Sequence, residues 1–461
     1  MSTTTPRLGK TGSMVSEATA DMSEQPTPAS NKPFSAQFTD KDTRTSAARS
    51  IYLKVMIGSS FAISLAIFGV FSIYWGSLWK TPVRQLHGWV VDFDGGEIGQ
   101  AVLQGIQNIP AAATKVHWEV HPAGEFPNGA ADVSAAVLEE HCWVAISINS
   151  GSSDALTSAL ANANASYAGS SAITVFAEEA RNENAFRGFI RPSVDAALQT
   201  ISKQYAIRFA QQLASASSSS VNLTSVLANA PQVITEPLSY TIANLRPFDV
   251  PVATAAVFVG LIYMTILAFF IVMTASAARQ MSGLENMLTY GSLVRVRIAT
   301  TFMIYFILSL FYSLLSMAFD LPFDRKFGNS GFLVFWMLNL FGMLALGLAL
   351  ESLITLLTPR FIPFFLLIWI ITNVSVALFP LDVLPGIFRY GYAWPFYNIS
   401  RAQRAIVFGT KNDVGLNFGV LIVWVTISCI TLPFFQWLVR RSDIKAQKTK
   451  ERLEEKVEEM P

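Results

Sequence analysis

A long apolar stretch decides the fold class of this chain. Residues 251–275 read PVATAAVFVGLIYMTILAFFIVMTA and contain no charged side chain. The hydrocarbon core of a bilayer is about 30 Å thick, so a helix needs roughly 20 apolar residues to cross it. The segment therefore predicts a membrane-spanning helix.

The composition of the whole chain agrees with this prediction. Of 461 residues, 52% are hydrophobic and only 14% are charged, whereas soluble domains carry about 25% charged residues. The formal net charge is +1, and the sequence has no long basic stripe. Because nucleic-acid binding requires such a stripe, we expect no nucleic-acid partner.

Six apolar windows are long enough to cross a membrane, which predicts an α-helical polytopic membrane protein with six transmembrane helices. The windows cover 51–75, 251–275, 298–319, 332–357, 361–378 and 418–439. The fourth and fifth follow each other closely, across Thr358-Pro359-Arg360. We treat them as separate helices because Pro359 and Pro363 interrupt helical hydrogen bonding.

Basic residues predict the orientation of these spans. Four Lys or Arg residues lie within 41–54 and six within 440–452, and Arg279 and Arg295 flank the turn between spans two and three. Because cytoplasmic segments carry an excess of Lys and Arg, both tails are predicted in the cytoplasm. The long segment 76–250 is then extracytoplasmic, and it holds two glycosylation triplets, at Asn164 and Asn222.

The segment 76–250 has the pattern of an α/β domain inserted between helices 1 and 2. Strands are predicted over 85–94, 115–120, 142–148 and 173–176, helices over 97–107, 133–140, 153–163 and 192–213, and an extended segment over 232–243. Strands that alternate with helices favour a small, mainly parallel sheet. Cys142 of this domain and Cys429 of the last span are the two cysteines of the chain, and we expect no disulfide between them.

The other segments complete the domain organisation. Residues 1–50 are rich in Ser, Thr, Pro and Ala and lack an apolar run, which predicts a disordered cytoplasmic tail. Span one covers 51–75, a five-helix membrane domain covers 251–440, and residues 441–461 form a charged cytoplasmic tail.

One motif in the inserted domain is similar to a catalytic motif. Asp92-Phe93-Asp94-Gly95 follows an apolar strand and resembles the aspartate motif of haloacid-dehalogenase phosphatases, whose first Asp is a nucleophile. That chemistry also needs a paired acidic motif to hold magnesium, and no Asp-Asp pair occurs in 76–250. We interpret the motif as a polar strand end that enters a turn, and we expect no enzymatic activity and no catalytic residue.

Two further patterns could bind a metal or a nucleotide. His117, Glu119 and His121 alternate along a predicted strand and share one face, where they could hold a metal ion, but a solvated strand face is our expectation. Gly9-Lys10-Thr11 imitates the end of a phosphate-binding loop, yet the first glycine of that motif would fall on Thr4. We expect no metal, no cofactor and no ATPase of its own.

Buried polar residues in the spans are candidates for function. Glu351 lies near the cytoplasmic end of the fourth span, and a carboxylate inside a membrane is a functional candidate by default. The alternatives are an extended side chain that reaches the interface or an ion pair with Arg360. Asn339 and Asn373 are expected to form interhelical hydrogen bonds.

The stretch 386–411, GIFRYGYAWPFYNISRAQRAIVFGTK, combines aromatic and basic residues. It predicts an interfacial or re-entrant segment with a short helix over 398–408 that ends at Gly409. Trp394 and its aromatic neighbours suit the level of the lipid head groups. Arg401 and Arg404 would share one helix face and could contact lipid phosphates or a substrate; the alternative is a membrane anchor without a role in transport.

Two stretches resemble a known family. VVDFDGGEIGQAVLQ (90–104) and RYGYAWPFYNISRAQRAIVFGTKNDVGLNFG (389–419) are similar to the fungal nitrosoguanidine-resistance membrane proteins, and the resemblance covers roughly 51–440. That family carries a domain of unknown function related to membrane subunits of type-2 ABC exporters and to phage-infection-like proteins. The resemblance implies resistance to a toxic compound, by export or by control of membrane lipid asymmetry.

The expected partners and location follow from this resemblance. Membrane lipids are the first expected partner, and a lipid flippase or a second copy of the chain is the next. The alternative to a transporter is a regulator or scaffold that acts on such a flippase without transporting anything itself. The expected location is the plasma membrane, with the endoplasmic reticulum or another endomembrane as the alternative.

Overall fold

The computed structural model describes residues 35–215 and 222–458. Residues 1–34, which contain Gly9-Lys10-Thr11 and most of the predicted cytoplasmic tail, lie outside the described residues. The chain divides into two compact units, residues 1–64 and 65–461. Helix α1 (Thr43–Ala66) makes up most of the described part of the first unit, and its residues are not buried.

The second unit contains long apolar helices. Five helices of the described chain are long and apolar enough to cross a membrane: Thr43–Leu78, Ala255–Met281, Tyr290–Ala318, Asp324–Val374 and Val414–Thr449. The first of these continues α1 through a π-helical turn (Ile67–Phe71) into α2 (Ser72–Leu78). The others contain α10 (Gly260–Met281), α12 (Tyr290–Ala318), α14 (Gly331–Val374) and α16 (Val414–Glu458).

The outer faces of these helices are strongly apolar. Phe270, Phe311 and Ile430 each expose at least 60% of their surface. Such side chains are unfavourable in water over a whole helix face and favourable in lipid. The chain is therefore a polytopic helical membrane protein.

Helix α14 is continuous in hydrogen bonding but is broken in its backbone angles. Thr358 has φ 61° and ψ 164°, which is not a helical conformation, and Pro359 and Pro363 follow it. The interruption lies at the position where the sequence predicts a turn between spans four and five.

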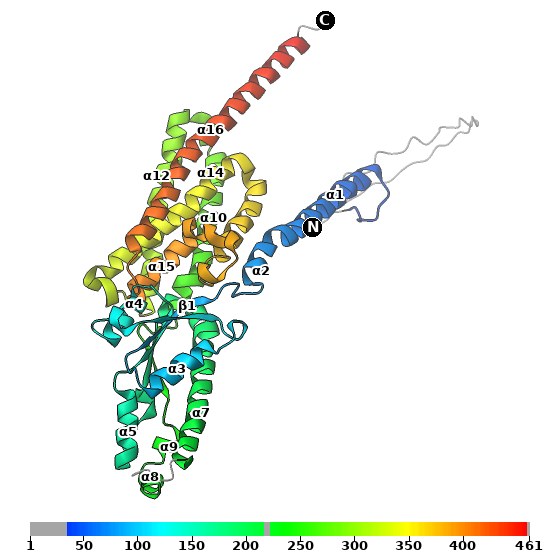
Figure 1. Cartoon of the computed structure of the whole chain (residues 1–461). Coiled ribbons are helices and arrows are strands. Elements are labelled where there is room, and N and C mark those ends of the chain that lie inside the picture. Colours follow the sequence, from blue (N-terminus) through cyan, green and yellow to red (C-terminus); the bar gives the residue numbers. More distant parts are fainter. Residues whose placement is uncertain (1–34, 216–221, 459–461) are drawn as a thin grey trace, which may run out of the picture. The chain divides into compact units, whose positions relative to one another are not determined.

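A five-stranded sheet occupies the segment after the first long helix (Figure 1). Its strands are β1 (Leu86–Asp92), β2 (Val116–His121), β3 (Val144–Ile148), β4 (Ile173–Ala177) and β5 (Tyr240–Asn244), in the order β2-β1-β3-β4-β5. Three of the four pairings are parallel, as predicted, but β3 and β4 are antiparallel.

Helices cover both faces of this sheet. One face packs against α3 (Glu97–Gln107), α5 (Ser152–Asn162) and α7 (Arg191–Ser215), and the other packs against α4 (Ala130–Leu138). In α3 the buried hydrophobic side chains are Ile98, Val102 and Ile106, whose four-residue spacing places them on one side of the helix. The predicted helix over 97–107 is thus confirmed, whereas the extended segment predicted over 232–243 begins as helix α9 (Gln232–Thr235).

The segment that follows α14 packs into the hydrophobic core of the sheet, while the long helices have a hydrophobic core of their own. Val376, Leu381 and Phe388, which follow α14, are buried in the same cluster as the sheet residues Leu86 and Val144. A backbone hydrogen bond joins Val83 N to Val383 O over 2.9 Å. This contact places the segment after α14 directly against the sheet.

Short elements complete this junction. They are α6 (Glu183–Ala185), α13 (Asp324–Phe327), the 3-10 helices Leu381–Val383 and Gly386–Ala393, and helix α15 (Pro395–Phe408), whereas α8 (Leu223–Asn229) lies at the far end of the α/β region and α11 (Leu284–Met287) lies between α10 and α12. In Figure 1, α15 lies between the sheet and the long helices α12, α14 and α16. The junction therefore brings together residues that are far apart in the sequence.

Candidate functional site

Helix α15 (Pro395–Phe408) forms one wall of the candidate site. Pro395 occupies its first turn, where its missing N–H removes no helical hydrogen bond. Gly409 ends the helix with φ 72°, a left-handed conformation that glycine adopts without strain. The short helix predicted over 398–408 is present and ends where predicted, but it begins at Pro395 and is almost entirely buried in protein.

The two arginines of this helix contact carboxylates of the α/β region. Arg404 Nη1 donates to Glu183 Oε2 over 2.5 Å and to the Ala180 carbonyl over 3.0 Å. Arg401 Nη2 donates to Glu140 Oε2 over 2.7 Å and also to Asp413. Only 6% of the Arg404 side chain is exposed, so the expectation that both guanidinium groups reach the lipid head groups is corrected for Arg404: a protein carboxylate occupies it.

A third arginine, Arg181, enters the site from the α/β region. Its guanidinium carbon lies 3.5 Å from the centre of the Trp143 ring, and its Nη1 donates to the Cys142 carbonyl over 2.9 Å. Its Nε is 3.8 Å from Glu140 Oε2, too far for a hydrogen bond. The aromatic ring and the carbonyl fix this guanidinium group in place.

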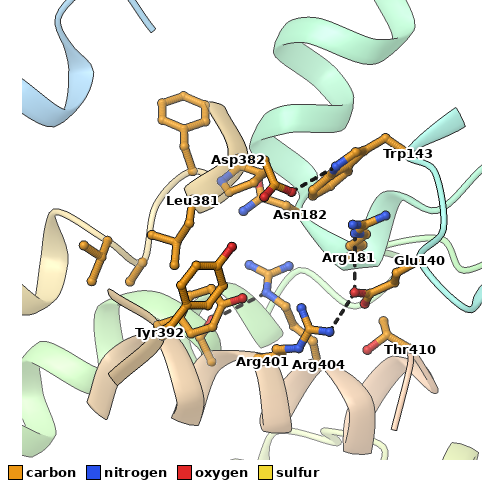
Figure 2. Close-up of a pocket in the computed structure, with 16 residues that line it drawn as sticks. Glu140, Trp143, Arg181, Asn182, Leu381, Asp382, Tyr392, Arg401, Arg404 and Thr410 are labelled. Atoms are coloured by element: carbon orange, nitrogen blue, oxygen red, sulfur yellow. Dashed lines mark hydrogen bonds and ion pairs between the residues drawn. The ribbon is translucent and has the colours of Figure 1, made fainter. Parts of the chain in front are cut away.

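These arginines border a cavity of about 230 Å³. Figure 2 shows Arg401 and Arg404 rising into it from α15, with Arg181 and Glu140 on one side and Tyr392 on the other. Its polar lining also includes Asn182, Ser400 and Thr410. Side chains from three separate parts of the sequence therefore converge on one space.

The opposite wall of the cavity is apolar. It comes from the segment directly after α14 and includes Val376, Ala377, Phe379 and Leu381. Asp382 follows this segment, and its Oδ2 accepts a hydrogen bond from Trp143 Nε1 over 3.3 Å. A cavity with one charged wall and one apolar wall suits a molecule that has a polar and an apolar part.

A buried carboxyl group lies close to the same arginines. Glu178 is 1% exposed, and neither of its carboxyl oxygens has a hydrogen-bond partner. Burial, together with repulsion from Glu140, raises the pKa of Glu178 to about 7, although Arg181, Arg246 and Arg401 oppose the shift. This group can therefore change its charge near neutral pH.

A second charge cluster joins the membrane helices. Glu351 of α14 is 1% exposed, and its Oε1 lies 2.7 Å from Arg297 Nε and 3.0 Å from Arg279 Nη2. Arg297 also donates to Thr355 Oγ1, Gln436 Oε1 and the Glu351 carbonyl. The suggested ion pair with Arg360 is therefore wrong, because Arg279 and Arg297 are the partners of Glu351.

The other polar residues predicted in the spans form structural contacts. Asn339 donates to Ser313 Oγ over 2.9 Å and accepts from Gln403, and Asn373 accepts from the Phe396 amide over 3.1 Å. These hydrogen bonds tie α14 to α12 and α15, which confirms the predicted interhelical role. Trp394 Nε1 donates to Thr372 Oγ1 over 3.2 Å, so this residue is packed against α14.

The aspartate motif serves the local fold. Asp94 accepts hydrogen bonds from the Ser153 amide and hydroxyl, and Asp92 accepts from the amides of Asp94 and Gly95. Gly95 has φ 63°, as the predicted turn requires. The absence of enzymatic activity stays a prediction.

Histidine side chains gather around Glu119 on the edge of the sheet. His87 Nδ1 and His117 Nε2 lie 3.4 and 3.7 Å from Glu119 Oε1, and all three side chains are largely exposed. Within residues 35–215 and 222–458, no group of three or more His, Cys, Asp or Glu side chains is arranged to hold a metal ion. Both predicted glycosylation acceptors, Asn164 and Asn222, are exposed.

Sequence reasoning identified the arginines of α15 but missed their partners. Glu140, Arg181 and Glu183 lie more than 200 residues away from them in the chain. A signal was present: the stretch EEARNEN (178–184) places a dense run of charged and amide residues directly after a buried strand. Polar residues at a strand end are frequent at binding sites.

Comparisons with known proteins agree with the membrane assignment. A family model described as "Protein of unknown function (DUF3533)" matches residues 59–430. The chain is 26% identical over 469 residues to the "Uncharacterized endoplasmic reticulum membrane protein YJR015W" of Saccharomyces cerevisiae, covering 92% of this chain and 89% of that protein. No solved structure matches the chain.

Proposed function

This chain belongs to the DUF3533 family, and on that premise we propose that it binds an amphipathic compound outside the cytoplasm and contributes to resistance to toxic compounds. The observation that carries the proposal is the cavity beside α15, with arginines on one wall and the apolar segment 376–381 on the other. The resemblance to nitrosoguanidine-resistance proteins and to membrane subunits of type-2 ABC exporters also supports a role in resistance to toxic compounds.

Two modes of action fit this site. In the first, the protein exports the bound compound or moves a lipid between leaflets, without an ATPase of its own. In the second, it is a regulator or scaffold that senses a lipid and acts on a flippase or on a second copy of itself. The charged side chains of the cavity are largely engaged with one another, which suits a site that opens when the α/β region moves relative to α15.

The proposed topology has six spans, with both tails in the cytoplasm and residues 76–250 on the other side. Helix α14 has 44 residues and would extend about 66 Å at 1.5 Å per residue, roughly twice the hydrocarbon core. The break at Thr358 divides it into residues 331–357, which are long enough to cross, and residues 359–374, which extend about 24 Å and would need the apolar residues that follow α14 to complete a span. The yeast relative is named as an endoplasmic reticulum membrane protein, so we propose that membrane before the plasma membrane.

Glycosylation tests this topology. Glycosidase treatment should shift the wild-type protein on a gel, and Asn164→Gln together with Asn222→Gln should abolish the shift. The triplet at Asn398 provides an internal comparison, because Asn398 is 2% exposed and should stay unmodified. Protease access to 76–250 only from the cytosolic side would contradict the proposed orientation.

An occluded cavity tests the function. Ala377 lines the cavity and is buried, so Ala377→Phe should fill part of the space and reduce resistance to the toxic compound. Ala393→Phe is the matched control, because Ala393 is exposed on the neighbouring 3-10 helix and does not line the cavity. Full resistance of Ala377→Phe, with normal amounts of protein in the membrane, would contradict the proposal.

Reconstitution separates the two modes of action. Purified protein in liposomes is assayed for lipid scrambling and for flux of the compound, with and without a pH gradient. If the wild-type protein shows flux in liposomes and Ala377→Phe abolishes that flux, the result supports transport. Resistance in cells without flux in liposomes supports the regulator. Asp92→Asn should leave resistance intact, because we propose no catalytic step.

A further inference from the structure

Arg181 has a donor, Nε, that forms no hydrogen bond with any of the described residues, although Glu140 lies 3.8 Å away. The side chain is only 10% exposed and lines the cavity, yet its Nε has no hydrogen-bond partner. Leaving a buried charged donor unpaired costs more free energy than a typical hydrogen bond contributes. The guanidinium group is nevertheless held rigidly by Trp143 and the Cys142 carbonyl, as expected for a group prepared to bind an oxygen from a ligand.

The charges of the cavity are ordered by depth. Arg404 and Arg181 lie inside, with 6% and 10% of their side chains exposed. Arg401 is intermediate, with 26% of its side chain exposed. Asp382, in contrast, is exposed at the rim. The inner end therefore holds these two arginines beside one lining carboxylate, Glu140, whose side chain is 9% exposed, and Asp382 adds a second carboxylate at the more exposed end.

A ligand with charge of one sign fits this arrangement poorly. Glu140, which is shared by Arg401 and Arg181, would repel a plain anion, and the three arginines would repel a plain cation. We infer that the cavity takes the zwitterionic head group of an amphiphile, with an anionic oxygen on Arg181 Nε and a cationic end toward Asp382. This inference rests on the proposed function, namely that the cavity binds an amphipathic compound.

The rest of the lining fits the same ligand. A phosphate or carboxylate oxygen is the acceptor that a guanidinium N–H binds best. Tyr392 and Tyr397 line the cavity as well and offer aromatic faces to an ammonium group. The apolar part of the ligand would lie along residues 376–381, at the end of α14. A membrane phospholipid and a free zwitterionic compound share this chemistry.

Binding to the purified full-length chain tests the inference. The protein, in a maltoside detergent, is titrated with dihexanoyl-phosphatidylcholine, which is zwitterionic, and with dihexanoyl-phosphatidylglycerol, which is anionic, and bound lipid is counted by native mass spectrometry. We expect the zwitterionic lipid to bind at least about tenfold more tightly, as one charge-assisted hydrogen bond or ion pair allows. Arg181→Lys, which retains the charge but lacks the Nε donor, should weaken this binding about tenfold.

Charge reversal at the rim gives the sharper result. Asp382→Lys should transfer the preference to the anionic lipid, and Asp382→Asn should reduce the preference without reversing it. Asp249→Lys is the matched control, because Asp249 is an exposed carboxylate that pairs with Arg325 outside the cavity, and it should leave the preference unchanged. The melting temperature of each variant identifies any that fail to fold, and Asp382→Asn then serves in place of Asp382→Lys.

The outcomes separate this inference from the proposed function. The inference that the cavity binds a zwitterionic head group would be contradicted if the wild type bound the anionic lipid as tightly as the zwitterionic one or more tightly. It would also be contradicted if Asp382→Lys still preferred the zwitterionic lipid to the same extent. If the wild type showed no preference for the zwitterionic lipid but Ala377→Phe still abolished lipid binding, the proposed function would stand without the zwitterionic head group. If Ala377→Phe bound lipid as well as the wild type, the proposed function and the inference would both be contradicted. Glycerophosphocholine, which has no acyl chains, distinguishes the sources: equal binding indicates a free zwitterion, and weaker binding indicates a membrane lipid.

Discussion

Two clusters of buried arginines differ in how many of their guanidinium nitrogens donate hydrogen bonds. The inner cluster is Arg279, Arg297 and Glu351 among the membrane helices, and the outer cluster is Arg181, Arg401 and Arg404 beside the cavity. In the inner cluster, each of the three guanidinium nitrogens of Arg297 donates at least one hydrogen bond, to Glu351, Thr355 or Gln436, although Glu351 Oε2 accepts none. In the outer cluster, Arg181 Nε lies 3.8 Å from Glu140 but has no hydrogen-bond partner among the described residues, and it lies beside a cavity of about 230 Å³. A saturated guanidinium group stabilises the fold, whereas an unsaturated one beside a cavity is available to a ligand. We therefore assign folding to the inner cluster and binding to the outer one.

The largest effect should come from the carboxylate of the inner cluster. Glu351→Gln leaves Arg279 and Arg297 buried without a counter-charge, and breaking such a pair costs about 3–5 kcal/mol of unfolding free energy. We expect a lower melting temperature in detergent and less protein in the membrane. Replacing Arg297 and Glu351 together with methionine should recover part of the loss, because fewer unpaired charges stay buried. A Glu351→Gln protein as stable as the wild type would show that the inner cluster is not structural.

A smaller effect should come from Glu178, beside the outer cluster. Its pKa is raised from 4.5 to about 7, so the folded protein binds a proton there more tightly than the unfolded chain does. Stability should fall as pH rises from about 4.5 to 7, by about 3 kcal/mol for a shift of this size. Glu178→Gln should remove this part of the pH dependence.

The measurement for Glu178 is the melting temperature of both proteins between pH 5 and 8. The variant should be more stable than the wild type at pH 8, and the difference should shrink toward pH 5. Glu140, Arg181, Arg246 and Arg401 face this carboxyl group and are the same in both proteins, so their titration cancels in the comparison. A difference that does not change with pH would contradict the assignment.

The smallest effect should come from an exposed pair that belongs to neither cluster. Arg325 and Asp249 form two hydrogen bonds of 2.9 and 3.0 Å, but their side chains are 34% and 45% exposed. Exposed ion pairs contribute about 0–1 kcal/mol, so Arg325→Gln should change the melting temperature little and resistance not at all. A large loss of either would mean that the distinction between buried and exposed pairs does not hold in this protein.

Local patterns predicted the elements that have local causes. The apolar spacing of Ile98, Val102 and Ile106 located α3, Gly409 located the end of α15, and Pro359 marked the break beside Thr358, whereas α15 begins three residues earlier than predicted. These features depend on neighbours within a few residues of each other. A sequence can therefore indicate them without knowledge of the tertiary contacts.

The features that the sequence did not predict depend on distant partners. The antiparallel pairing of β3 with β4 runs against the usual outcome for strands joined through a helix. Arg401 pairs with Glu140 across 261 positions, and Arg297 pairs with Glu351 across 54. No periodicity or capping signal connects such residues, so the arginines could be identified as candidates but their partners, and the cavity between them, could not.

Resistance of cells that carry Arg181→Lys tests the central claim most directly. The substitution retains the positive charge and removes the Nε donor, which has no hydrogen-bond partner within the described residues and belongs to a side chain that lines the cavity. At a protein level in the membrane matched to wild type, and with a melting temperature far closer to wild type than that of Glu351→Gln, the account predicts that most of the resistance is lost. Full resistance in these cells would contradict the assignment of the outer cluster to ligand binding.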